Sequence, residues 1–557
     1  MLIMENSFKK EKEKFFVELI KPSHYDNDGY VIQWWKSFSI SNSLSCLYGL
    51  TLDSAERKIL GENVDIIVNL HDEYSTVLPI AAITRRIRQK GNRGVIALVG
   101  VQTNQFPRSV DIARPFREAG IPVVIGGFHV SAAIAVLSEI PPETQEALDM
   151  GITLFSGEAE GHLDQLLSDA YHQKLKPIYN VVEDLPDLRG QPTPLLPQAM
   201  IEKSLSSNIH IDTGRGCPFD CSFCTIINIQ GQKSRFRTAD DVEKMVRSYS
   251  RNGGKTPHFF FTDDNFARNR NWEAIFDRLI ELREKENFKV RLGLQVDANA
   301  HKIPRFIDKA AQAGCNNVFI GIESVNEENL KAANKPQNNI EEYRKMLIAW
   351  RKNSVVTMSG YILGFPADTP DSIENDIRTI QRELPIDILM FFILTPLPGS
   401  MDHKAILQRG EWMESDFNKY DSEHATMKHP KMTKEELEGI FRKAWDLYYS
   451  PEHVEEMLHR ASRDGISPSR LLWKILISQF CIKHEDAHPF QCGAFRKKVR
   501  RQRRWGMPLE NPILFYPRRA WEIGRTALLI SIYFWRLERL KKSVKKNASK
   551  LSGDVRL

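Results

Sequence analysis

Short runs of apolar and β-branched residues alternate with helical patterns along the first third of the chain. Runs of this kind, each followed by a helix, are typical of βαβ units around a parallel sheet. The predicted strands are FFVELI at 15–20, DIIVNL at 65–70, VIALVGV at 95–101, VVIGG at 123–127 and TLFSG at 153–157. We therefore expect a five-stranded, doubly wound (Rossmann-like) α/β domain over residues 1–183, which binds ligands outside the carboxyl ends of its strands.

A second series of the same kind begins near residue 206. Its predicted strands are IHID at 209–212, HFFFT at 258–262, VRLGLQV at 290–296, VFIGI at 318–322, VVTMSGYIL at 355–363 and ILMFFIL at 388–394. Thr238 before an acidic turn predicts a helix start, and Gly253 and Gly314 predict helix ends. Six βα repeats predict a partial (β/α)6 barrel of the TIM type over residues 206–425, with its chemistry at the carboxyl ends of the strands.

The two α/β units are separated by a proline-rich stretch, DLPDLRGQPTPLLPQ at 184–198. Such a composition indicates a linker, which we place at residues 184–205. After about residue 430 the pattern becomes helical and basic, so residues 426–557 are expected to form a helical C-terminal region.

Composition narrows the class of protein. The 557 residues are 42% hydrophobic and 27% charged, which excludes a disordered or low-complexity chain. Seven cysteines are too few for a disulfide scaffold, and the N-terminus is charged where a secretory signal would be apolar. A cytoplasmic location is therefore expected. The longest apolar run near the C-terminus, 526–535, is about half of the ~20 residues that span a bilayer, so no transmembrane segment is predicted.

Charge is unevenly distributed along the chain. The net charge of +6 does not by itself indicate a nucleic-acid partner, and none is expected. Residues 496–557, however, contain 18 Lys and Arg against 4 Asp and Glu, together with Trp521, Tyr533, Phe534 and Trp535. This segment is compatible with a helix on an anionic membrane surface, with a solvated basic helix, or with a docking site for an acidic reductant.

The strongest local motif is RGCPFDCSFC, in which Cys217, Cys221 and Cys224 follow the first strand of the second unit. Thiolates suit a [4Fe-4S] cluster or zinc. A structural zinc site normally has four ligands, so three cysteines indicate either an open coordination position or a fourth ligand from elsewhere, for which His210 is the nearest imidazole. A zinc site and unliganded loop cysteines remain alternatives.

With Phe223 directly before the last cysteine, this loop resembles the defining motif of the radical S-adenosylmethionine (SAM) superfamily over about residues 206–400. The resemblance implies a [4Fe-4S] cluster held by the three cysteines, with SAM chelating the fourth iron. It also implies an electron donor such as flavodoxin or ferredoxin, and a 5′-deoxyadenosyl radical that takes hydrogen from an unreactive carbon.

Further strand ends resemble the superfamily's SAM-binding segments. The residues implied in SAM binding are Phe223, Asp263, Asp264, Asn265, Glu323, Ser324 and Gly364. Asp263 and Asp264 replace part of a Gly-Gly-Glu segment that holds the amino group of SAM, where a carboxylate makes charge-assisted bonds; alternatively, either caps the following helix. Glu323 is expected near the ribose hydroxyls, unless it caps the next helix. Gly364 belongs to an adenine-contacting segment, although glycine also lets a strand end tightly.

The first unit resembles the cobalamin-binding domain of cobalamin-dependent radical SAM enzymes. IGGFHVS at 125–131 and SGEAE at 156–160 look like that subfamily's Gly-Gly-x-His and Gly-Glu-x-Glu segments, and VQTNQFPR at 101–108 ends a neighbouring strand. The implied cobalamin contacts are Thr103, Asn104, Gln105, Gly126, Gly127, His129, Ser156, Gly157 and Glu158. The Asp-x-His-x-x-Gly loop that supplies cobalt with a histidine is absent, which implies cobalamin without a histidine lower ligand. A flavodoxin-like domain that binds another nucleotide or nothing remains an alternative.

The resemblance implies an enzyme that uses a [4Fe-4S] cluster, SAM and cobalamin to methylate an unactivated carbon of a small molecule. A lipid-like substrate would fit a membrane-bound C-terminus. A cobalamin-binding radical SAM cyclase or rearrangement enzyme is the alternative among enzymes. From another class, a non-catalytic corrinoid-binding or zinc-binding module remains open. A methylthiotransferase is not expected, because the sequence has no second cysteine trio.

Overall fold

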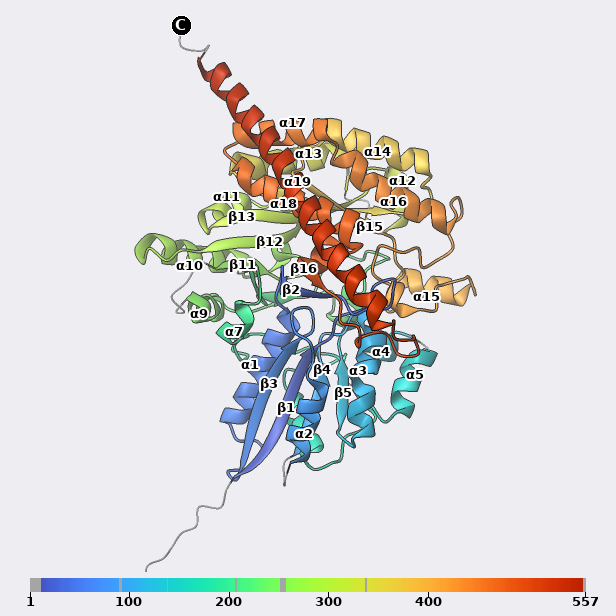
Figure 1. Cartoon of the computed structure of the whole chain (residues 1–557). Coiled ribbons are helices and arrows are strands. Elements are labelled where there is room, and N and C mark those ends of the chain that lie inside the picture. Colours follow the sequence, from blue (N-terminus) through green and yellow to red (C-terminus); the bar gives the residue numbers. More distant parts are fainter. Residues whose placement is uncertain are drawn as a thin grey trace, which may run out of the picture.

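The computed structural model describes residues 12–89, 93–137, 139–205, 208–250, 257–335 and 338–553. Two six-stranded sheets with helices around them form most of the molecule. Figure 1 shows the N-terminal sheet, in blue, below the second sheet, in green to yellow, with the C-terminal helices beside the second sheet.

The first sheet is parallel throughout and has the strand order β3-β1-β4-β5-β6-β7. Its strands are β1 (Glu13–Lys21), β3 (Val64–Asp72), β4 (Arg93–Leu98), β5 (Val123–Gly126), β6 (Thr153–Ser156) and β7 (Ile178–Asn180). The first five confirm the predicted strands. The short edge strand β7 was not predicted, because three residues carry too little periodicity to be recognised.

Helices cover both faces of this sheet. The helices are α1 (Asn42–Glu56), α2 (Ile80–Arg88), α3 (Phe106–Glu118), α4 (Phe128–Ala135), α5 (Pro142–Asp149) and α6 (Leu163–Tyr171). Phe16 and Ile20 of β1 pack with α2 and α3, whereas Phe15, Val17 and Leu19 pack with α1 and α6. Since successive side chains of a strand point to opposite faces, a sheet covered on both faces needs strands that are apolar throughout.

The second sheet is also parallel, and its strands follow one another in chain order, β8-β11-β12-β13-β14-β15, as in a partial barrel. They are β8 (Asn208–Ile211), β11 (His258–Phe261), β12 (Arg291–Asp297), β13 (Cys315–Glu323), β14 (Val356–Leu363) and β15 (Ile388–Ile393). The helices that follow them are α9 (Ala239–Ser250), α10 (Trp272–Lys285), α11 (Phe306–Gln312), α12 (Glu327–Ala332), α13 (Ile340–Lys352) and α14 (Pro370–Glu383). All six predicted strands are present.

The predicted helix signals in this unit agree with the structure where it describes them. The Thr238 hydroxyl accepts a hydrogen bond from the Asp241 amide at 3.1 Å, at the start of α9. Gly314 follows α11 with a φ of 104°, which favours glycine. Gly253 lies outside the described residues.

The chain between the sheets forms no helix or strand from Val181 to Pro197, where the linker was predicted. It then enters the short helix α7 (Gln198–Ile201). The C-terminal helices are α15 (Met401–Gln408), α16 (Lys434–Tyr448), α17 (Pro451–Arg463), α18 (Pro468–Phe480) and α19 (Pro512–Gly553). The domain limits at residues 183, 205 and 425 stay predictions.

The C-terminal region is helical with one strand that the sequence did not reveal. β16 (Gly493–Lys497) pairs antiparallel with β2 (Gln33–Ser37), so the C-terminal region is joined to the first part of the chain. No helix in the described part of the chain is long and apolar enough to cross a membrane.

Candidate functional site

The three motif cysteines lie on one loop between β9 (Gly214–Arg215) and α8 (Ile226–Ile229), beyond the carboxyl end of β8. Cys221 is buried, and Cys217 and Cys224 are half-buried. The loop starts at Gly216, whose φ is 91° and whose added Cβ would lie 2.5 Å from the Lys233 carbonyl oxygen. Glycine is therefore required at this turn.

Burial sets the protonation of these thiols. It raises the pKa of Cys221 to about 11 and that of Cys224 to about 12, so the free side chains are neutral thiols at physiological pH. Metal ligation needs the thiolate. In the described part of the chain, no three His, Cys, Asp or Glu side chains form a single-ion site. A polynuclear cluster, in which the thiolates bind different irons, does not need ligands that converge on one ion.

Backbone hydrogen bonds fix the loop to three other segments. The Cys217 amide donates to the Gly231 carbonyl at 3.2 Å, and the Ser222 amide donates to Ala333 after α12 at 3.3 Å. The Asp402 amide at the start of α15 donates to the Ser222 carbonyl at 3.1 Å. The sulfur atoms are thus carried by a loop whose backbone position is defined by its neighbours.

The two adjacent aspartates after β11 have different surroundings. Asp263 is buried and accepts hydrogen bonds from the Thr213 hydroxyl and from Asn269 Nδ2, the latter at 2.8 Å. Asp264 is half-buried and accepts from the Gly216 amide at 2.8 Å, directly beside Cys217. Burial raises the pKa of Asp263 to about 7 and that of Asp264 to about 6. Neither caps a helix, because the turn that follows starts at Asn265 without a side-chain cap.

Asn265 hydrogen-bonds to the carboxylate of Asp297, a residue that the sequence did not single out. Its Nδ2 donates to Asp297 Oδ2 at 2.9 Å, and Arg268 binds the same carboxylate through two hydrogen bonds of 2.8 Å. The Arg268 guanidinium also lies 5.4 Å from the ring centroid of Phe219 in the cysteine loop. The signal available in the sequence was the position of Asp297 at the end of the third predicted strand.

Glu323 and Ser324 lie where β13 ends. Glu323 has a φ of 61° and forms an ion pair with the buried Lys335 at 2.6 Å. Ser324 is fully buried, and its Oγ accepts from the Asn326 amide at 3.1 Å. The alternative that Glu323 caps the next helix is wrong, because Asn326 caps α12 by accepting from the Glu328 amide at 2.9 Å.

Gly364 and Phe223 belong to neighbouring parts of the same region. Gly364 follows β14 with a φ of 92°, and its amide donates to Asp368 Oδ2 at 2.9 Å. The Phe365 amide donates to the same oxygen at 3.0 Å. Phe223 packs against a small apolar cluster that includes Phe365. The segments after β13 and β14 therefore lie next to the cysteine loop.

A cavity of about 360 Å³ connects this region with the first domain. Gly126, Gly127, Gly157 and Glu158 from the predicted cobalamin contacts line it, and so does Asp264. It reaches into the layer between the first sheet and helices α1 and α6, where its wall is apolar. The apolar lining includes Val17, Leu19, Val95, Val124, Leu163 and Leu167.

Two of the glycines allow no side chain. Gly127 has a φ of 148°, and an added Cβ would lie 2.1 Å from the Val101 amide nitrogen. Gly157 has a φ of 112°, and its Cβ would lie 2.7 Å from the Val181 carbonyl carbon. The wall of the cavity at these points is therefore bare backbone, which can approach a large ligand closely.

The remaining predicted cobalamin contacts do not line this cavity. Thr103, Asn104 and Gln105 form a buried 3₁₀ turn, in which Gln105 Oε1 accepts from Lys21 Nζ at 2.7 Å. Ser156 donates through its hydroxyl to Asn180 Oδ1 at 3.1 Å. His129 lies between the rings of Phe106 and Phe417, at centroid distances of 4.3 and 4.8 Å. Both of its ring nitrogens are buried without a hydrogen-bond partner, and burial lowers its pKa to about 3.

Arg215, two residues before Cys217, joins the two domains. It forms ion pairs with Glu158 at 2.5 Å and Glu160 at 2.6 Å in the first domain, and with Asp212 at 2.9 Å in the second. Arg235 binds Glu158 as well. Sequence reasoning missed this arginine, although it stands directly before the cysteine motif. Glu158 thus lines the cavity and also bonds across the domain junction.

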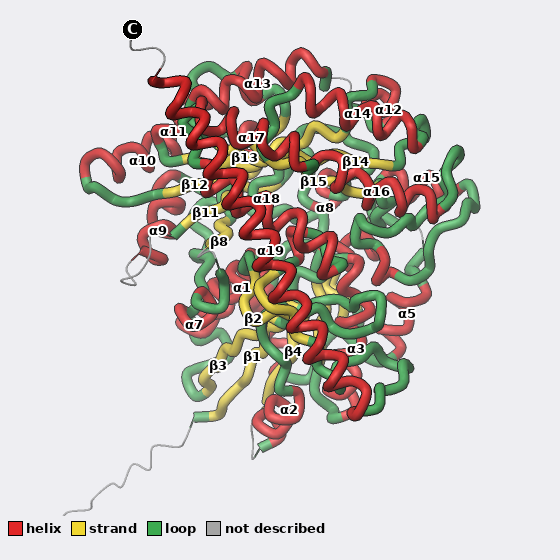
Figure 2. Tube along the Cα trace, turned by 45° about the horizontal axis from the view of Figure 1, so that its top comes forward, coloured by secondary structure: helices red, strands yellow, loops and turns green. Residues whose placement is uncertain are grey.

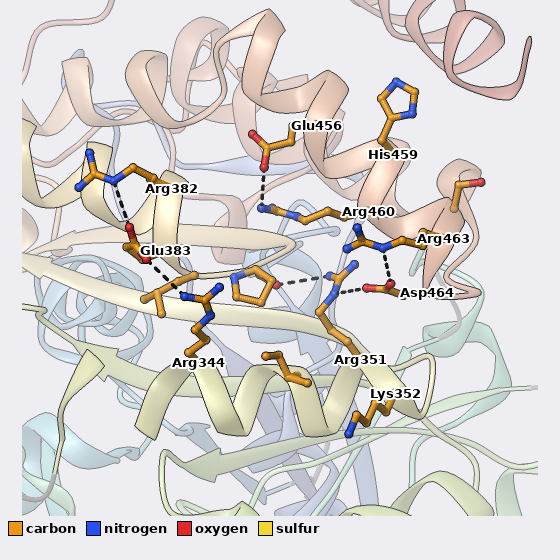
Figure 3. A pocket seen from close by; sticks show the side chains of 14 residues that line it. Arg344, Arg351, Lys352, Arg382, Glu383, Glu456, His459, Arg460, Arg463 and Asp464 are labelled. Atoms are coloured by element: carbon orange, nitrogen blue, oxygen red, sulfur yellow. Dashed lines mark hydrogen bonds and ion pairs between the residues drawn. The ribbon is translucent and has the colours of Figure 1, made fainter. Parts of the chain in front are cut away.

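A larger hollow, of about 1020 Å³, lies away from the cysteine loop, near the amino ends of β14 and β15. Figure 3 shows that its charged side chains pair largely with one another, for example Arg460 with Glu456 and Arg351 with Asp464. Several of its cations stand in the last turns of α13, α14 and α17, where positive charge complements the helix carbonyls. It does not contain the predicted site residues.

Comparison with known proteins finds a matching family profile and several similar proteins. The Radical SAM superfamily profile matches residues 211–380. Bacteriochlorophyllide d C-8(2)-methyltransferase of Chlorobaculum tepidum is 28% identical over 358 residues, which are 62% of this chain and 75% of that protein. Hopanoid C-2 methylase of Rhodopseudomonas palustris is 26% identical over 411 residues, 70% of this chain and 74% of the relative.

Among solved structures, the radical SAM methyltransferase TsrM from Kitasatospora setae, with cobalamin and a [4Fe-4S] cluster bound, matches with a TM-score of 0.57. The match covers 82% of this chain and 97% of TsrM at 14% identity, so it concerns the fold. The chain is therefore an enzyme whose residues 211–380 match the Radical SAM superfamily, and its two-domain fold is similar to that of TsrM.

Proposed function

We propose that the protein is a cobalamin-dependent radical SAM C-methyltransferase that acts on an unactivated carbon. The observation that carries this proposal is the cavity between the two domains, which joins a glycine-walled, apolar slot in the first domain to the margin of the cysteine loop in the second. The two curated relatives described above support it, since both are named as methyl-transferring enzymes and match 62% and 70% of the chain.

The residues present fit a [4Fe-4S] cluster. Cys217, Cys221 and Cys224 offer three sulfur ligands from one loop, and the described residues around them form no closed four-ligand site for a single ion. Lys335, buried near Cys221, lowers the pKa of that thiol against the larger effect of burial. A fixed positive charge of this kind favours thiolate ligands.

The fit to SAM rests on the strand ends around the loop. Asp264 is the carboxylate next to the cysteine loop, so we assign it, rather than Asp263, to the amino group of SAM. The Asp263 carboxylate is already bonded to Thr213 and Asn269. Glu323 and the backbone at Gly364 remain the proposed ribose and adenine contacts, and Lys335 would orient Glu323.

The fit to cobalamin rests on the slot itself. Gly126, Gly127 and Gly157 would let backbone approach the ligand, and the apolar wall between α1 and α6 would receive the flat base of its nucleotide tail. His129 does not line the cavity, and we propose no histidine ligand to cobalt.

When bound, the cluster and SAM supply radical chemistry at an unreactive carbon, and cobalamin supplies a methyl group. The protein itself would position these groups relative to one another. The cysteine loop is fixed by its backbone bonds, Arg215 holds the two domains together across the cavity, and the apolar lining excludes water from the slot.

We further propose a large, apolar, lipid-like substrate, a flavodoxin or ferredoxin as the electron donor, and a cytoplasmic location. The names of the two relatives, which refer to a bacteriochlorophyllide and a hopanoid, support the substrate class. A cobalamin-binding radical cyclase remains the second candidate. Methyl transfer requires S-adenosylhomocysteine to appear together with 5′-deoxyadenosine, whereas a cyclase would yield 5′-deoxyadenosine without it.

The cluster is tested by anaerobic reconstitution with iron and sulfide. The wild-type chain should bind about four irons, as one [4Fe-4S] cluster requires, and cleave SAM when reduced. Cys221→Ala should lose both properties. Cys315→Ala, at a buried cysteine outside the motif, should keep them. A wild-type protein that takes up one zinc and no iron would contradict the proposal.

The cobalamin slot is tested by a pair of glycine variants. Gly127→Ala should lose cobalamin binding, measured by gel filtration and absorbance, because its Cβ has no room at the Val101 amide. Gly161→Ala is the matched control, since Gly161 also has a positive φ but no atom lies within 4 Å of its added Cβ. If both variants bind cobalamin as the wild type does, the slot is not its site.

A further inference from the structure

The C-terminal helix α19 has one face against the protein and the other in solvent. Phe515 and Leu537 are buried, and Tyr533 and Leu540 pack against the core of the second domain. The helix contacts α17 and α18. Figures 1 and 2 both show it as a long red helix that crosses the outside of the molecule, from the level of the first domain past the helices of the second.

The solvent face of α19 is apolar. Leu514, Trp521, Leu528 and Trp535 are seven residues apart, so they share one side of the helix over successive pairs of turns. Their exposed fractions are 70, 63, 61 and 57%. Ile532 lies in the same row at 100° per residue. Four further exposed apolar side chains extend the solvent face to one side of this row: Ile513, Tyr516, Ile523 and Phe534. A contiguous exposed face of this kind on a monomer marks an interaction site.

Positive charge borders the apolar face. The exposed charged side chains of α19, within the part whose side chains are described, are all cations: Arg518, Arg525, Arg536, Arg539 and Lys542. Its acids, Glu522 and Glu538, are half-buried and ion-paired. The guanidinium of Arg525 lies 5.4 Å from the Trp521 ring and that of Arg539 lies 4.5 Å from the Trp535 ring. Aromatic and cationic groups combined in this way suit the level of lipid headgroups.

The dimensions fit a helix that lies on a bilayer. From Ile513 to Trp535 the apolar face is roughly 35 Å long at 1.5 Å per residue. No described helix is apolar enough to span a membrane. A helix with a broad apolar face and a basic border lies in the interface, with its apolar side at the boundary of headgroups and acyl chains.

We propose that α19 docks this protein on an anionic membrane surface through the face from Ile513 to Trp535. The basic border attracts anionic headgroups, and the tryptophans and leucines enter the interface. A second copy of the chain fits less well, because pairing the same faces would bring two rows of arginines together. An acidic protein would neutralise those arginines but would leave the aromatic face uncovered. This inference does not depend on the proposed methyl transfer.

Flotation of the full-length protein with vesicles tests the proposal. The wild type should bind vesicles of phosphatidylglycerol and phosphatidylcholine at low salt, bind pure phosphatidylcholine far less, and lose binding as salt increases. The double variant Trp521→Glu, Leu528→Glu should bind at least about tenfold more weakly, since charge on the apolar face opposes insertion. Trp412→Glu is the control, because Trp412 is also an exposed tryptophan, at 50%, but lies outside α19.

Three results would overturn the proposal. One is a wild type that does not bind anionic vesicles. The second is equal binding by the double variant and the wild type. The third is a wild-type dimer in solution that the double variant converts to a monomer, because α19 would then pair copies of the chain. Should the double variant fail to fold, Arg525→Glu with Arg536→Glu tests the basic border, and the fluorescence shift of wild-type tryptophans on vesicle addition tests insertion without any substitution.

Discussion

At the scale of single residues, the two adjacent aspartates show how position decides chemistry. The sequence treats Asp263 and Asp264 alike, yet one carboxylate is enclosed by Thr213 and Asn269 and the other borders the cavity beside the cysteine loop. Side chains of neighbouring residues at a strand end point in different directions, so only one of such a pair can face a ligand. The structure thus separates an enclosed carboxylate from one that lines the cavity.

Asp263 gives a pH-dependent prediction. Its pKa of about 7 in the folded protein exceeds its unfolded value of about 4, so the native state binds more protons between these pH values and loses stability as the pH rises through them. Asp263→Asn removes that loss and can still hydrogen-bond to Thr213 and Asn269. Relative to the wild type, the variant should therefore gain free energy of unfolding from pH 4 to pH 8, by up to about 4 kcal/mol at 1.36 kcal/mol per pKa unit.

Urea unfolding of the two proteins at several pH values measures this difference. Asp371→Asn, at an exposed position on α14, should show no comparable change with pH. If the difference in free energy of unfolding between wild type and Asp263→Asn stays constant across this pH range, ionising Asp263 costs no free energy in the folded protein.

At the scale of secondary-structure elements, buried ion pairs fix how helices join the second sheet. Arg351 near the end of α13 is almost fully buried and binds Asp387 at the start of β15 and Asp464 after α17, the latter at 2.7 Å (Figure 3). Asp387 also accepts from the Thr357 amide at 2.9 Å. One guanidinium therefore ties two helices and two strands together.

Arg351→Met should destabilise the second domain by about 3–5 kcal/mol, because it leaves the Asp387 carboxylate buried without its cation. Thermal unfolding would report a clear decrease in Tm. Arg382→Met provides the control, since Arg382 is exposed and pairs with Glu383 at the surface, where such pairs contribute at most about 1 kcal/mol. Equal effects of the two substitutions would mean that the Arg351 pairs contribute no more than a surface pair.

At the scale of the whole molecule, the site exists because two α/β domains meet. The cysteine loop comes from the second domain and the glycine-walled slot from the first, and Arg215 bonds to carboxylates of both. Burial raises the pKa of Glu160, but its bonds to Arg215 outweigh this effect and leave that pKa below its usual value. The buried carboxylates at the domain junction are thus stabilised by their ion pairs with Arg215.

Arg215→Met should weaken the junction, since Glu158, Glu160 and Asp212 would keep their buried charges with fewer cations. We expect the free energy of unfolding to fall by about 3–5 kcal/mol, and proteolytic cleavage in the predicted linker at 184–205 to become faster. Arg57→Met removes exposed ion pairs within the first domain. It should change the free energy of unfolding by at most about 1 kcal/mol and leave the cleavage rate unchanged. Should Arg215→Met leave cleavage of the linker as slow as in the wild type, other contacts hold the domains together.

Local sequence patterns were sufficient for most of the secondary structure. The eleven predicted strands of the two large sheets appear as apolar runs because both faces of each sheet are covered, and Thr238 marks a helix start through its own side chain. The exceptions are short or depend on distant partners. β7 has three residues, and β16 forms only because β2, more than 450 residues earlier, supplies its hydrogen bonds.

The sequence by itself determined the two α/β units, the cysteine motif and the basic C-terminal segment, because each is encoded by neighbouring residues. The tertiary structure alone decided which groups share a surface. It placed Asp264 rather than Asp263 at the cavity, paired Lys335 with Glu323, turned His129 away from the slot, and exposed the apolar face of α19. These outcomes depend on contacts between residues far apart in the chain, and such contacts follow from how the sheets and helices pack rather than from local sequence pattern.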